Sequence, residues 1–199
     1  MDLSLCINTA SSHTSIALFD EDKLIEEKTW QSHNDEAEKL MPKIAELIEN
    51  FTHIKKIYCI SGPGSFTGLR VGVSTANTIA YLNDCRLYAI DTFEYWQTAA
   101  PSKDAVLVIF AGKGGVYLDK EQATNLDQAA EILKGKEIFG DITEDQKFAL
   151  SNSKFLETKI SFGEIMQKLI TQDRESTKII KPLYIKSPSI TKSKQPCYT

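Results

Sequence analysis

The chain has 199 residues, of which 42% are hydrophobic and 25% charged, a composition typical of folded globular proteins and not of disordered or fibrous ones. The formal net charge is −4, so the chain as a whole carries no positive field that would hold RNA or an anionic membrane. Five lysines lie near the C-terminal end, where residues 178–199 contain no Asp or Glu: Lys178, Lys181, Lys186, Lys192 and Lys194. We expect any RNA contact to come through a partner or through this local patch.

The N-terminal residues lack a basic segment followed by a long apolar run, and no stretch reaches the roughly 18 apolar residues that a membrane span needs. We therefore expect a cytoplasmic protein with no membrane contact. The four cysteines, Cys6, Cys59, Cys85 and Cys197, form no CxxC pair, and the three histidines show no metal-ligand spacing. The sequence thus predicts neither a disulfide nor a metal site.

The first half of the chain predicts strands followed by helices. Three short strands come first, joined by short connections that make neighbours antiparallel: Leu3–Asn8, Ser15–Phe19 and Lys23–Trp30. Apolar residues then recur at spacings of three and four from Ala37 to Phe51, which indicates an amphipathic helix. A strand at 57–61, a glycine turn at 62–65 and a second helix at 66–82 follow. Another strand at 87–90 then leads to a short helix at 92–96 with Asp91 as its N-cap.

After Pro101 the same order begins again. We predict strands at 105–110, 116–118 and 137–139, a helix at 126–133 capped by Asn125, and a helix capped by Ser161 that runs to about Thr171. The region between the last strand and Ser161 gives no clear pattern. The shared order of the two halves predicts a duplicated α/β unit whose second copy is shortened.

The helix predicted over 66–82 is more apolar than one buried face requires. Its apolar and small residues cover an arc of roughly 200°, about twice the stripe of an ordinary surface helix. Small residues recur within this arc every four positions and would let another helix approach closely: Gly68, Gly72, Ala76 and Ala80. Either the first helix of this chain covers the second side, or a helix of another molecule does.

We expect the second arrangement, a helix contact between molecules. The predicted partner-binding residues are Leu69, Val73, Ala76 and Ala80 together with the small residues Gly68 and Gly72, and Leu40, Met41 and Ile44 contribute from the preceding helix.

The glycine-rich loop before this helix is a candidate phosphate site, because free backbone N–H groups at a helix N-terminus attract anions. The residues concerned are Gly62, Gly64 and Ser65, with Asn8 from the first strand. The loop lacks both the Lys-Ser/Thr ending of a Walker A motif and the GxGxxG spacing. The glycines would alternatively serve a tight turn, with Ser65 as the N-cap.

The run from Ser61 to Val73, SGPGSFTGLRVGV, resembles the signature of the bacterial TsaB (YeaZ) family, and Ile90-Asp91-Thr92 follows at the distance seen there. Weaker similarities lie at residues 7–10, 33–42 and 182–186. The resemblance covers most of residues 1–95 and is thin between Pro101 and Lys181.

This resemblance implies an actin-like (ASKHA) α/β fold, a duplicated ribonuclease-H-like architecture with domains at 1–97 and 98–199. The first domain would carry the partner-binding helices, and the second, reduced domain would carry the basic tail. The resemblance also implies a non-catalytic scaffold and activator in the formation of N6-threonylcarbamoyladenosine (t6A) at position 37 of tRNA. Its implied partners are the catalytic subunit TsaD, the ATPase TsaE and a second copy of the chain, with tRNA contacted only through the complex.

The residue at the end of the first strand favours a non-catalytic role. Actin-like phosphotransferases usually place an aspartate there to hold Mg²⁺, whereas this chain has Asn8. A neutral amide does not supply the charge that the metal needs. We therefore expect no cofactor and weak or absent nucleotide binding.

Two other functions remain open. The loop from Gly62 to Gly68 would serve an actin-like ATP-binding phosphotransferase or hydrolase. A glycoprotease-like peptidase would use Ser65 or Ser74 as nucleophile, but the spacing identifies no base for either serine.

Overall fold

The computed structural model describes residues 2–32, 35–112, 114–120 and 122–185. Its first sheet is built around the buried strand β1 (Leu3–Asn8). β1 pairs antiparallel with β2 (His13–Asp20) and parallel with β4 (Ile54–Gly62). The edges are β3 (Lys23–Gln31) and β5 (Arg86–Asp91), so that the strand order is β3-β2-β1-β4-β5. The predicted antiparallel meander of the first three strands is confirmed.

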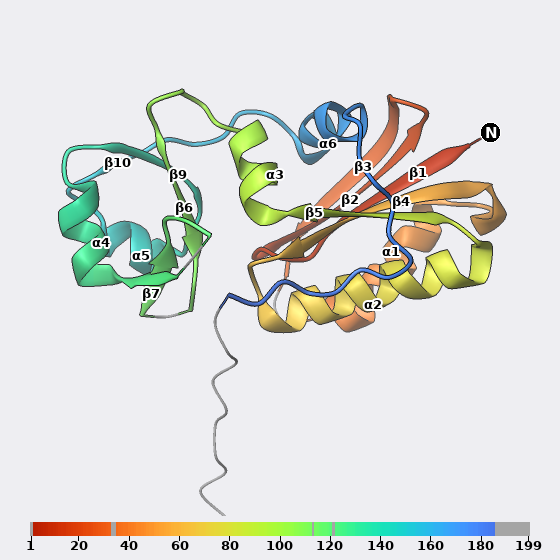
Figure 1. Cartoon of the computed structure of the whole chain (residues 1–199), viewed down its shortest axis with the longest axis horizontal. Coiled ribbons are helices and arrows are strands. Elements are labelled where there is room, and N and C mark those ends of the chain that lie inside the picture. Colours follow the sequence, from red (N-terminus) through yellow and green to blue (C-terminus); the bar gives the residue numbers. More distant parts are fainter. Residues whose placement is uncertain (1, 33–34, 113, 121, 186–199) are drawn as a thin grey trace, which may run out of the picture.

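Helices cover both faces of this sheet (Figure 1). α1 (Glu36–Leu47) and α2 (Phe66–Asn83) lie on one face, and α3 (Thr92–Thr98) and α6 (Phe162–Ile170) lie on the other. Strand β4 shows why two cores form, since Ile57 and Cys59 enter the core beneath α1 and α2 whereas Tyr58 and Ile60 enter the core beneath α3 and α6. We call this sheet with its helices the first unit.

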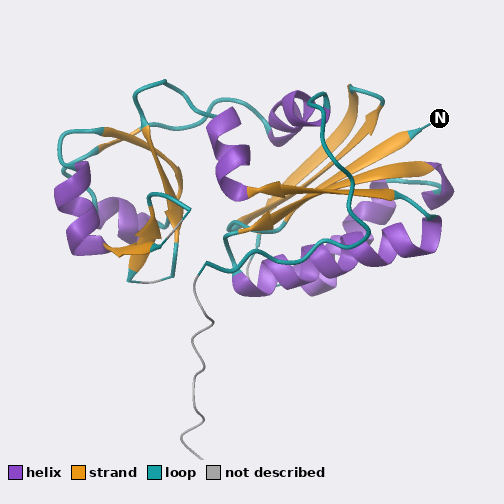
Figure 2. Ribbon diagram, viewed as in Figure 1, coloured by secondary structure: helices purple, strands orange, loops and turns teal. Residues whose placement is uncertain are grey.

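The second unit repeats the same connectivity on a smaller scale (Figure 2). Its strands are β6 (Val106–Phe110), β7 (Gly115–Tyr117), β8 (Ala123–Asn125), β9 (Glu137–Asp141) and β10 (Lys154–Phe155), in the order β10-β9-β6-β7-β8. Its helices are α4 (Leu126–Leu133) and α5 (Glu144–Ala149). The strand order matches that of the first unit element by element, which confirms the predicted duplication. α5 has 6 residues where its counterpart α2 has 18, so the second copy is the reduced one.

The two units also share a loop at the same place. Gly62, at the end of β4, and Gly140, near the end of β9, both have positive φ angles, 120° and 128°. Three residues later a hydroxyl residue caps the next helix, since Ser65 Oγ accepts from the N–H of Gly68 and Thr143 Oγ1 accepts from the N–H of Gln146. Residues that carry a side chain rarely adopt this backbone conformation, so glycine is needed at both turns.

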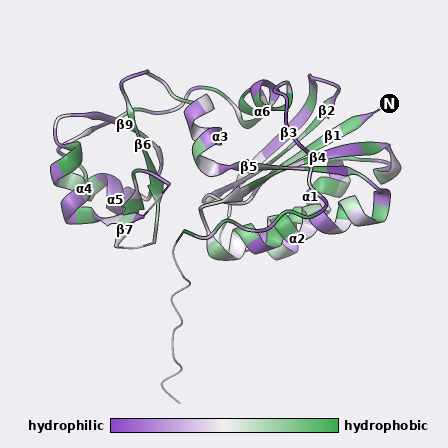
Figure 3. Cartoon of the chain, viewed as in Figure 1, coloured by the Kyte–Doolittle hydropathy of each residue, from purple (hydrophilic) through white to green (hydrophobic). Residues whose placement is uncertain are grey.

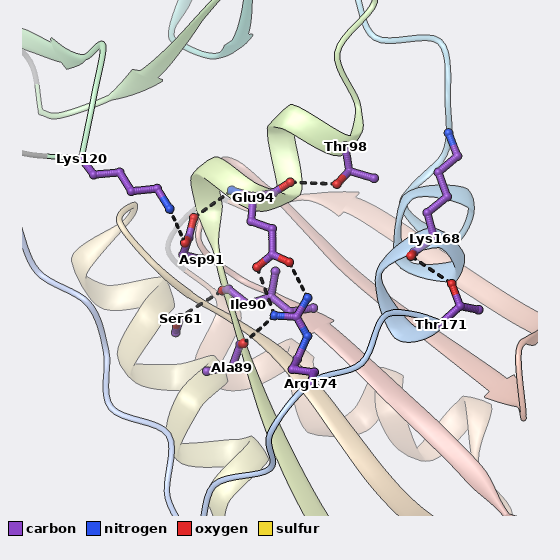
Figure 4. Close-up of polar contacts among 10 residues, drawn as sticks. All are labelled: Ser61, Ala89, Ile90, Asp91, Glu94, Thr98, Lys120, Lys168, Thr171 and Arg174. Atoms are coloured by element: carbon purple, nitrogen blue, oxygen red, sulfur yellow. Dashed lines mark hydrogen bonds and ion pairs between the residues drawn. The ribbon is translucent and has the colours of Figure 1, made fainter.

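After α6 the chain forms a segment that lies along the first unit, here called the C-terminal strap (residues 172–185). Its Thr177 N–H donates to the carbonyl of Leu87 in edge strand β5, at 2.8 Å. Arg174 forms two hydrogen bonds with the Glu94 carboxylate and one with the carbonyl of Ala89 (Figure 4). The strap therefore covers an edge that would otherwise offer free backbone groups to other chains.

α6 also belongs to the first unit by its contacts, although it lies within residues 98–199 of the sequence. Ser161 Oγ and the N–H of Gly163 both donate to the Glu27 carboxylate on β3. Ile165, Met166 and Leu169 are buried in the core beneath α3 and α6. The chain thus leaves the first unit, forms the second, and returns to the first.

Some predicted boundaries were wrong. α1 ends at Leu47 and not at Phe51, because Ile48 is extended and Phe51 belongs to a 3-10 turn, η1 (Phe51–His53), that begins after Asn50. The short elements β8, α5 and β10 were not predicted. Cys6, Cys59 and Cys85 are free thiols. Cys197 and the tail lysines Lys186, Lys192 and Lys194 lie outside the described residues.

Candidate functional site

The face of α2 that we predicted to bind a partner is covered by this chain itself. Leu69, Val73, Ala76 and Ala80 are each at most 5% exposed, and Gly68 and Gly72 are also buried. On α1, Leu40 and Ile44 are buried and only Met41, at 41%, is exposed. The premise that this face needs another molecule to cover it is therefore wrong. Most of it packs with α1 and the sheet.

The small residues of α2 serve a close approach to the turn after β1. A Cβ atom on Gly68 would lie 2.0 Å from the carbonyl oxygen of Thr9, and one on Gly72 would lie 2.1 Å from Thr9 Oγ1. The Thr9 hydroxyl donates to the carbonyl of Gly68 at 2.7 Å. Gly68 and Gly72 therefore let the helix pack closely on the turn after β1, and not on a partner helix.

The exposed apolar surface of α1 and α2 lies on a face of α2 next to the face that we predicted. A groove of about 530 Å³ runs between α1, α2 and η1, and its apolar lining comes from Met41, Phe51, Ile79 and Leu82. Leu82 is 72% exposed, and the neighbouring Tyr81 is 88% exposed. Hydrophobic segments recur along α2 in Figure 3. Exposed apolar side chains gathered beside a groove are typical of a protein contact site.

The glycine-rich loop is held by protein contacts on both sides. A Cβ atom on Gly64 would lie 2.3 Å from the carbonyl oxygen of Ala10, and one on Gly62 would lie 2.5 Å from that of Leu183 in the strap. The N–H of Ser65 donates to the Ala10 carbonyl at 2.7 Å, and the N–H of Leu183 donates to the Ser61 carbonyl at 2.7 Å. These contacts account for the glycines through packing, and phosphate binding stays a prediction.

Asn8 also has a local role. Its Oδ1 accepts from the N–H of Ala10 at 2.9 Å and so shapes the turn that carries Thr9. Asn8 is buried, and its side chain interacts with that of Tyr95 on α3. Ser65, a candidate nucleophile, is occupied as the N-cap of α2.

A cleft between the two units is the second candidate site. It consists of two adjoining hollows of about 220 and 740 Å³, both lined by Ser12, Asp141, Ile142 and Thr143. The smaller hollow reaches Glu36 at the start of α1 and Ser65 at the start of α2. The larger hollow reaches His13, Trp96 and Lys147. The two equivalent loops, after β4 and β9, therefore face the same cleft.

Asp141 is the strongly perturbed acid of this cleft. Burial raises its pKa from the ordinary value of 3.8 to about 6, and Lys147 opposes the shift. The same carboxylate raises the pKa of Tyr95, whose own burial has the larger effect. A perturbed acid in a cleft indicates a functional role more often than one on an open surface.

Sequence reasoning missed five residues of these sites: Glu36, Tyr81, Leu82, Asp141 and Thr143. A signal existed for Thr143, because Thr-x-x-Gln at 143–146 is a capping box and follows Gly140 by the same interval that separates Gly62 from Ser65. No sequence signal showed that Glu36 would be buried.

The comparisons with known proteins agree with this architecture. The family described as "TsaD: tRNA N6-adenosine threonylcarbamoyltransferase" matches residues 27–159. The chain is similar to the tRNA threonylcarbamoyladenosine biosynthesis protein TsaB of Bacillus subtilis (strain 168), with 29% identity over 127 residues. That match covers 61% of this chain and 56% of the relative, so the chain spans little more than half of that protein's length.

Two solved structures share the fold. YeaZ from Pseudomonas aeruginosa aligns with a TM-score of 0.51 and 22% identity over 59% of this chain and 57% of that one. A protein described as uncharacterized "with similarity to peptidase YEAZ from Pseudomonas aeruginosa" aligns with a TM-score of 0.71 and 15% identity over 94% of this chain and 100% of that one. The predicted fold, an actin-like duplicated ribonuclease-H-like architecture, is confirmed, and so is the resemblance to the TsaB (YeaZ) family.

Within the described residues, no helix combines the length and the hydropathy that crossing a bilayer requires. The same residues contain no group of three His, Cys, Asp or Glu side chains arranged to hold a metal ion.

Proposed function

Because this chain belongs to the family described as "TsaD: tRNA N6-adenosine threonylcarbamoyltransferase" and is related to TsaB (YeaZ) proteins, we propose that it takes part in t6A biosynthesis as a non-catalytic subunit. In this role it binds the catalytic subunit TsaD, supports the ATPase TsaE and contacts tRNA only through the assembled complex.

The observation that carries this proposal is the exposed groove between α1 and α2. Two of its apolar side chains, Met41 and Leu82, are exposed to solvent in the isolated chain. Burying such side chains in a contact yields roughly 25 cal/mol for each Å² of apolar surface removed from water. We assign the TsaD contact to this groove instead of to the buried face of α2.

The cleft between the units supports the non-catalytic part of the proposal. Asn8 stands where a phosphotransferase would place its metal-binding aspartate, and its amide holds the Ala10 turn. The smaller hollow is lined by two acidic residues, Glu36 and Asp141, whose negative charge repels the phosphates of a nucleotide. These features disfavour the ATP-dependent alternative, which calorimetry with ATP and Mg²⁺ would test.

The test of the proposal is binding to purified TsaD by size-exclusion chromatography with light scattering. The substitution Leu82→Glu places a charge in the groove at an exposed position, so the chain stays folded while its affinity for TsaD falls by about tenfold or more. Phe148→Glu is the matched control, because Phe148 is 83% exposed on α5 of the second unit.

Unchanged co-elution of the Leu82→Glu variant with TsaD would overturn the assignment of the groove. A second copy of the chain is the competing occupant, and sedimentation of the chain alone at several concentrations measures it. A further readout is t6A formation by TsaD and TsaE. We expect the amount of t6A to rise when this chain is added, and we expect this chain alone to form no t6A.

A further inference from the structure

The C-terminal strap is bound along one side of α2 (Figure 1). Asn77 on α2 holds the strap backbone twice, because its Nδ2 donates to the carbonyl of Ile180 and its Oδ1 accepts from the N–H of Ile180, both at 2.9 Å. Four residues further along the strap, the ring of Tyr184 packs against Phe66 in the first turn of α2, with 5.0 Å between the ring centres. The strap therefore runs antiparallel to α2, and the two present a joint surface to solvent.

Large apolar side chains of this joint surface are open to solvent. Tyr81, one turn of α2 beyond Asn77, is 88% exposed. On the strap, Ile179 is 55% exposed although the next residue, Ile180, is buried in the core. The exposed set is Tyr81, Ile179, Leu183 and Tyr184. Such a group of side chains is typical of a contact with another protein.

The charge of the joint surface has one sign. Residues 66–83 and 176–185 contain no Asp or Glu, although the chain as a whole has a net charge of −4. Their exposed cations are Arg70, Lys178 and Lys181, and no described carboxylate lies within ion-pair distance of them. A matching partner surface therefore carries carboxylates. RNA is also anionic, but proteins that hold it by its backbone commonly make about six to ten phosphate contacts, so three cations among apolar side chains suit a protein better.

The groove that we assign to TsaD lies on the opposite side of α2. Its lining residues Ile79 and Leu82 are about 200° and about 140° around the helix from Asn77. A helix with its side chains is about 10 Å wide, whereas a stable contact covers about 800 Å² on each partner, a patch roughly 30 Å across. A partner seated in the groove therefore extends beyond it, either over α1 or over the strap.

The composition of these two sides favours the strap. The exposed residues of α1 include Lys39 and Glu46, which are already paired with Asp35 and Lys28. Interface cores are depleted in Lys, Glu and Asp and enriched in Tyr, Met and Arg. The strap side offers two tyrosines and Arg70, whose Cζ lies 3.9 Å from the centre of an aromatic ring and is thereby held in place.

We propose that the joint surface of α2 and the strap is the second part of the TsaD contact, and that the matching surface of TsaD is apolar with carboxylates at its edge. This inference rests on the proposed function, because it takes the groove as the first part of the same contact. Tyr81 and Ile179 then lose their solvent exposure on binding, and Lys178 and Lys181 pair with carboxylates of TsaD.

The experiment measures the affinity of the full chain for purified TsaD by calorimetry. Ile179→Ser removes apolar contact area and should weaken the affinity by about fivefold. Ile132→Ser is the matched control, because Ile132 is 51% exposed on α4 of the second unit, and it should leave the affinity within about twofold.

The charges are tested by the double variant Lys178→Glu, Lys181→Glu at several salt concentrations. It should weaken the affinity by about tenfold at low salt and by less at high salt, because added ions screen the repulsion of carboxylates. The double variant Lys134→Glu, Lys136→Glu changes the net charge equally at exposed positions of the second unit and should leave the affinity within about twofold.

Leu82→Glu in the groove separates this inference from the proposed function. If Leu82→Glu weakens TsaD binding while the Ile179 and lysine variants leave it unchanged, the second part of the contact is wrong and the groove assignment stands. If the wild type binds no TsaD, both are wrong. Saturable binding of tRNA by the chain alone, lost in the lysine variant while TsaD affinity stays unchanged, would also overturn the inference.

Amide hydrogen exchange at Thr177 and Leu183 reports whether the strap stays bound in each variant, since both amides donate to backbone carbonyls of the first unit. We expect these amides to stay protected in the lysine variant. A loss of TsaD affinity confined to variants that release the strap would contradict a direct contact.

Discussion

Lys120 Nζ lies 2.6 Å from Asp91 Oδ2 and thereby links the second unit to the start of α3 (Figure 4). The other oxygen of the same carboxylate, Oδ1, accepts from the N–H of Glu94 at 2.8 Å and caps α3. One side chain therefore stabilises a helix end of the first unit and holds a residue that follows β7 of the second. The Lys120 ammonium also lies 5.8 Å from the centre of the Phe93 ring.

These two roles of Asp91 predict unequal effects of substitution. Asp91→Ala removes both cap and ion pair and should lower the free energy of unfolding by about 1–2 kcal/mol. Lys120→Ala removes only a pair near the surface and should cost less than about 1 kcal/mol. Urea unfolding measures the free energy of unfolding of both variants and of Asp91→Asn, which keeps the capping oxygen. Equal losses for Asp91→Ala and Lys120→Ala would contradict the dual role.

Gly68→Ala should be strongly destabilising, although alanine favours helices more than glycine does. The added methyl would lie 2.0 Å from the carbonyl oxygen of Thr9, which is backbone and moves only with the turn after β1. We expect a loss of about 2–4 kcal/mol in urea unfolding. Gly114→Ala, where the methyl meets no atom within 4 Å, is the control and should change the stability by less than about 1 kcal/mol. A neutral Gly68→Ala would show that the turn adapts.

Asp141 should make the stability depend on pH. Its pKa is raised from 3.8 to about 6 by burial, so the folded chain holds this proton more tightly than the unfolded chain. The stabilising effect is fully present below pH 3.8 and is lost as the pH rises through about 6. Two pKa units correspond to at most about 3 kcal/mol.

Asp141→Asn should therefore stabilise the chain by about 1–3 kcal/mol at pH 7.5 and by little at pH 4. Unfolding curves of wild type and variant at both pH values measure this difference, while the other titrating groups cancel in the comparison. A gain of the same size at both pH values would argue against titration of this carboxyl.

The ion pair between Arg174 and Glu94 should control how firmly the strap is held. Glu94→Gln leaves the partly buried guanidinium of Arg174 without its counter-charge, and the amides of Thr177 and Leu183 should then exchange with solvent faster, by about tenfold. Hydrogen exchange measured by NMR gives these rates. Glu137→Gln, which removes an exposed pair with Lys154, is the control and should leave the strap amides unchanged. Unchanged exchange in Glu94→Gln would mean that backbone contacts alone hold the strap.

Most of the longer helices were predictable because their signals are local. The predicted helix over 66–82 differs from α2 by one residue, and the caps at Ser65, Asp91, Asn125 and Ser161 are all present. Each cap depends on a side chain and a backbone N–H only three residues away, which sequence spacing records directly.

What covers each face of α2 was not predictable in the same way. A row of small residues allows the close approach of any backbone, and the sequence does not distinguish a partner helix from the turn at Thr9, 59 residues away. The cleft between the units was not predictable from the sequence for a similar reason. Glu36 and Asp141 come together only because the two units pack, and no spacing within one element records that contact.

The return of the chain through α6 and the strap has a consequence for synthesis on the ribosome. Ile165, Met166 and Ile180 fill the cores of the unit whose strands are made first, and Thr177 pairs with its edge strand β5. The strands of the first unit leave the exit tunnel first, and part of their apolar surface therefore stays exposed until the second unit, α6 and the strap have also been translated. Nascent chains from which α6 and the strap have not yet emerged should accordingly depend on chaperones, whereas chains in which both have emerged should not.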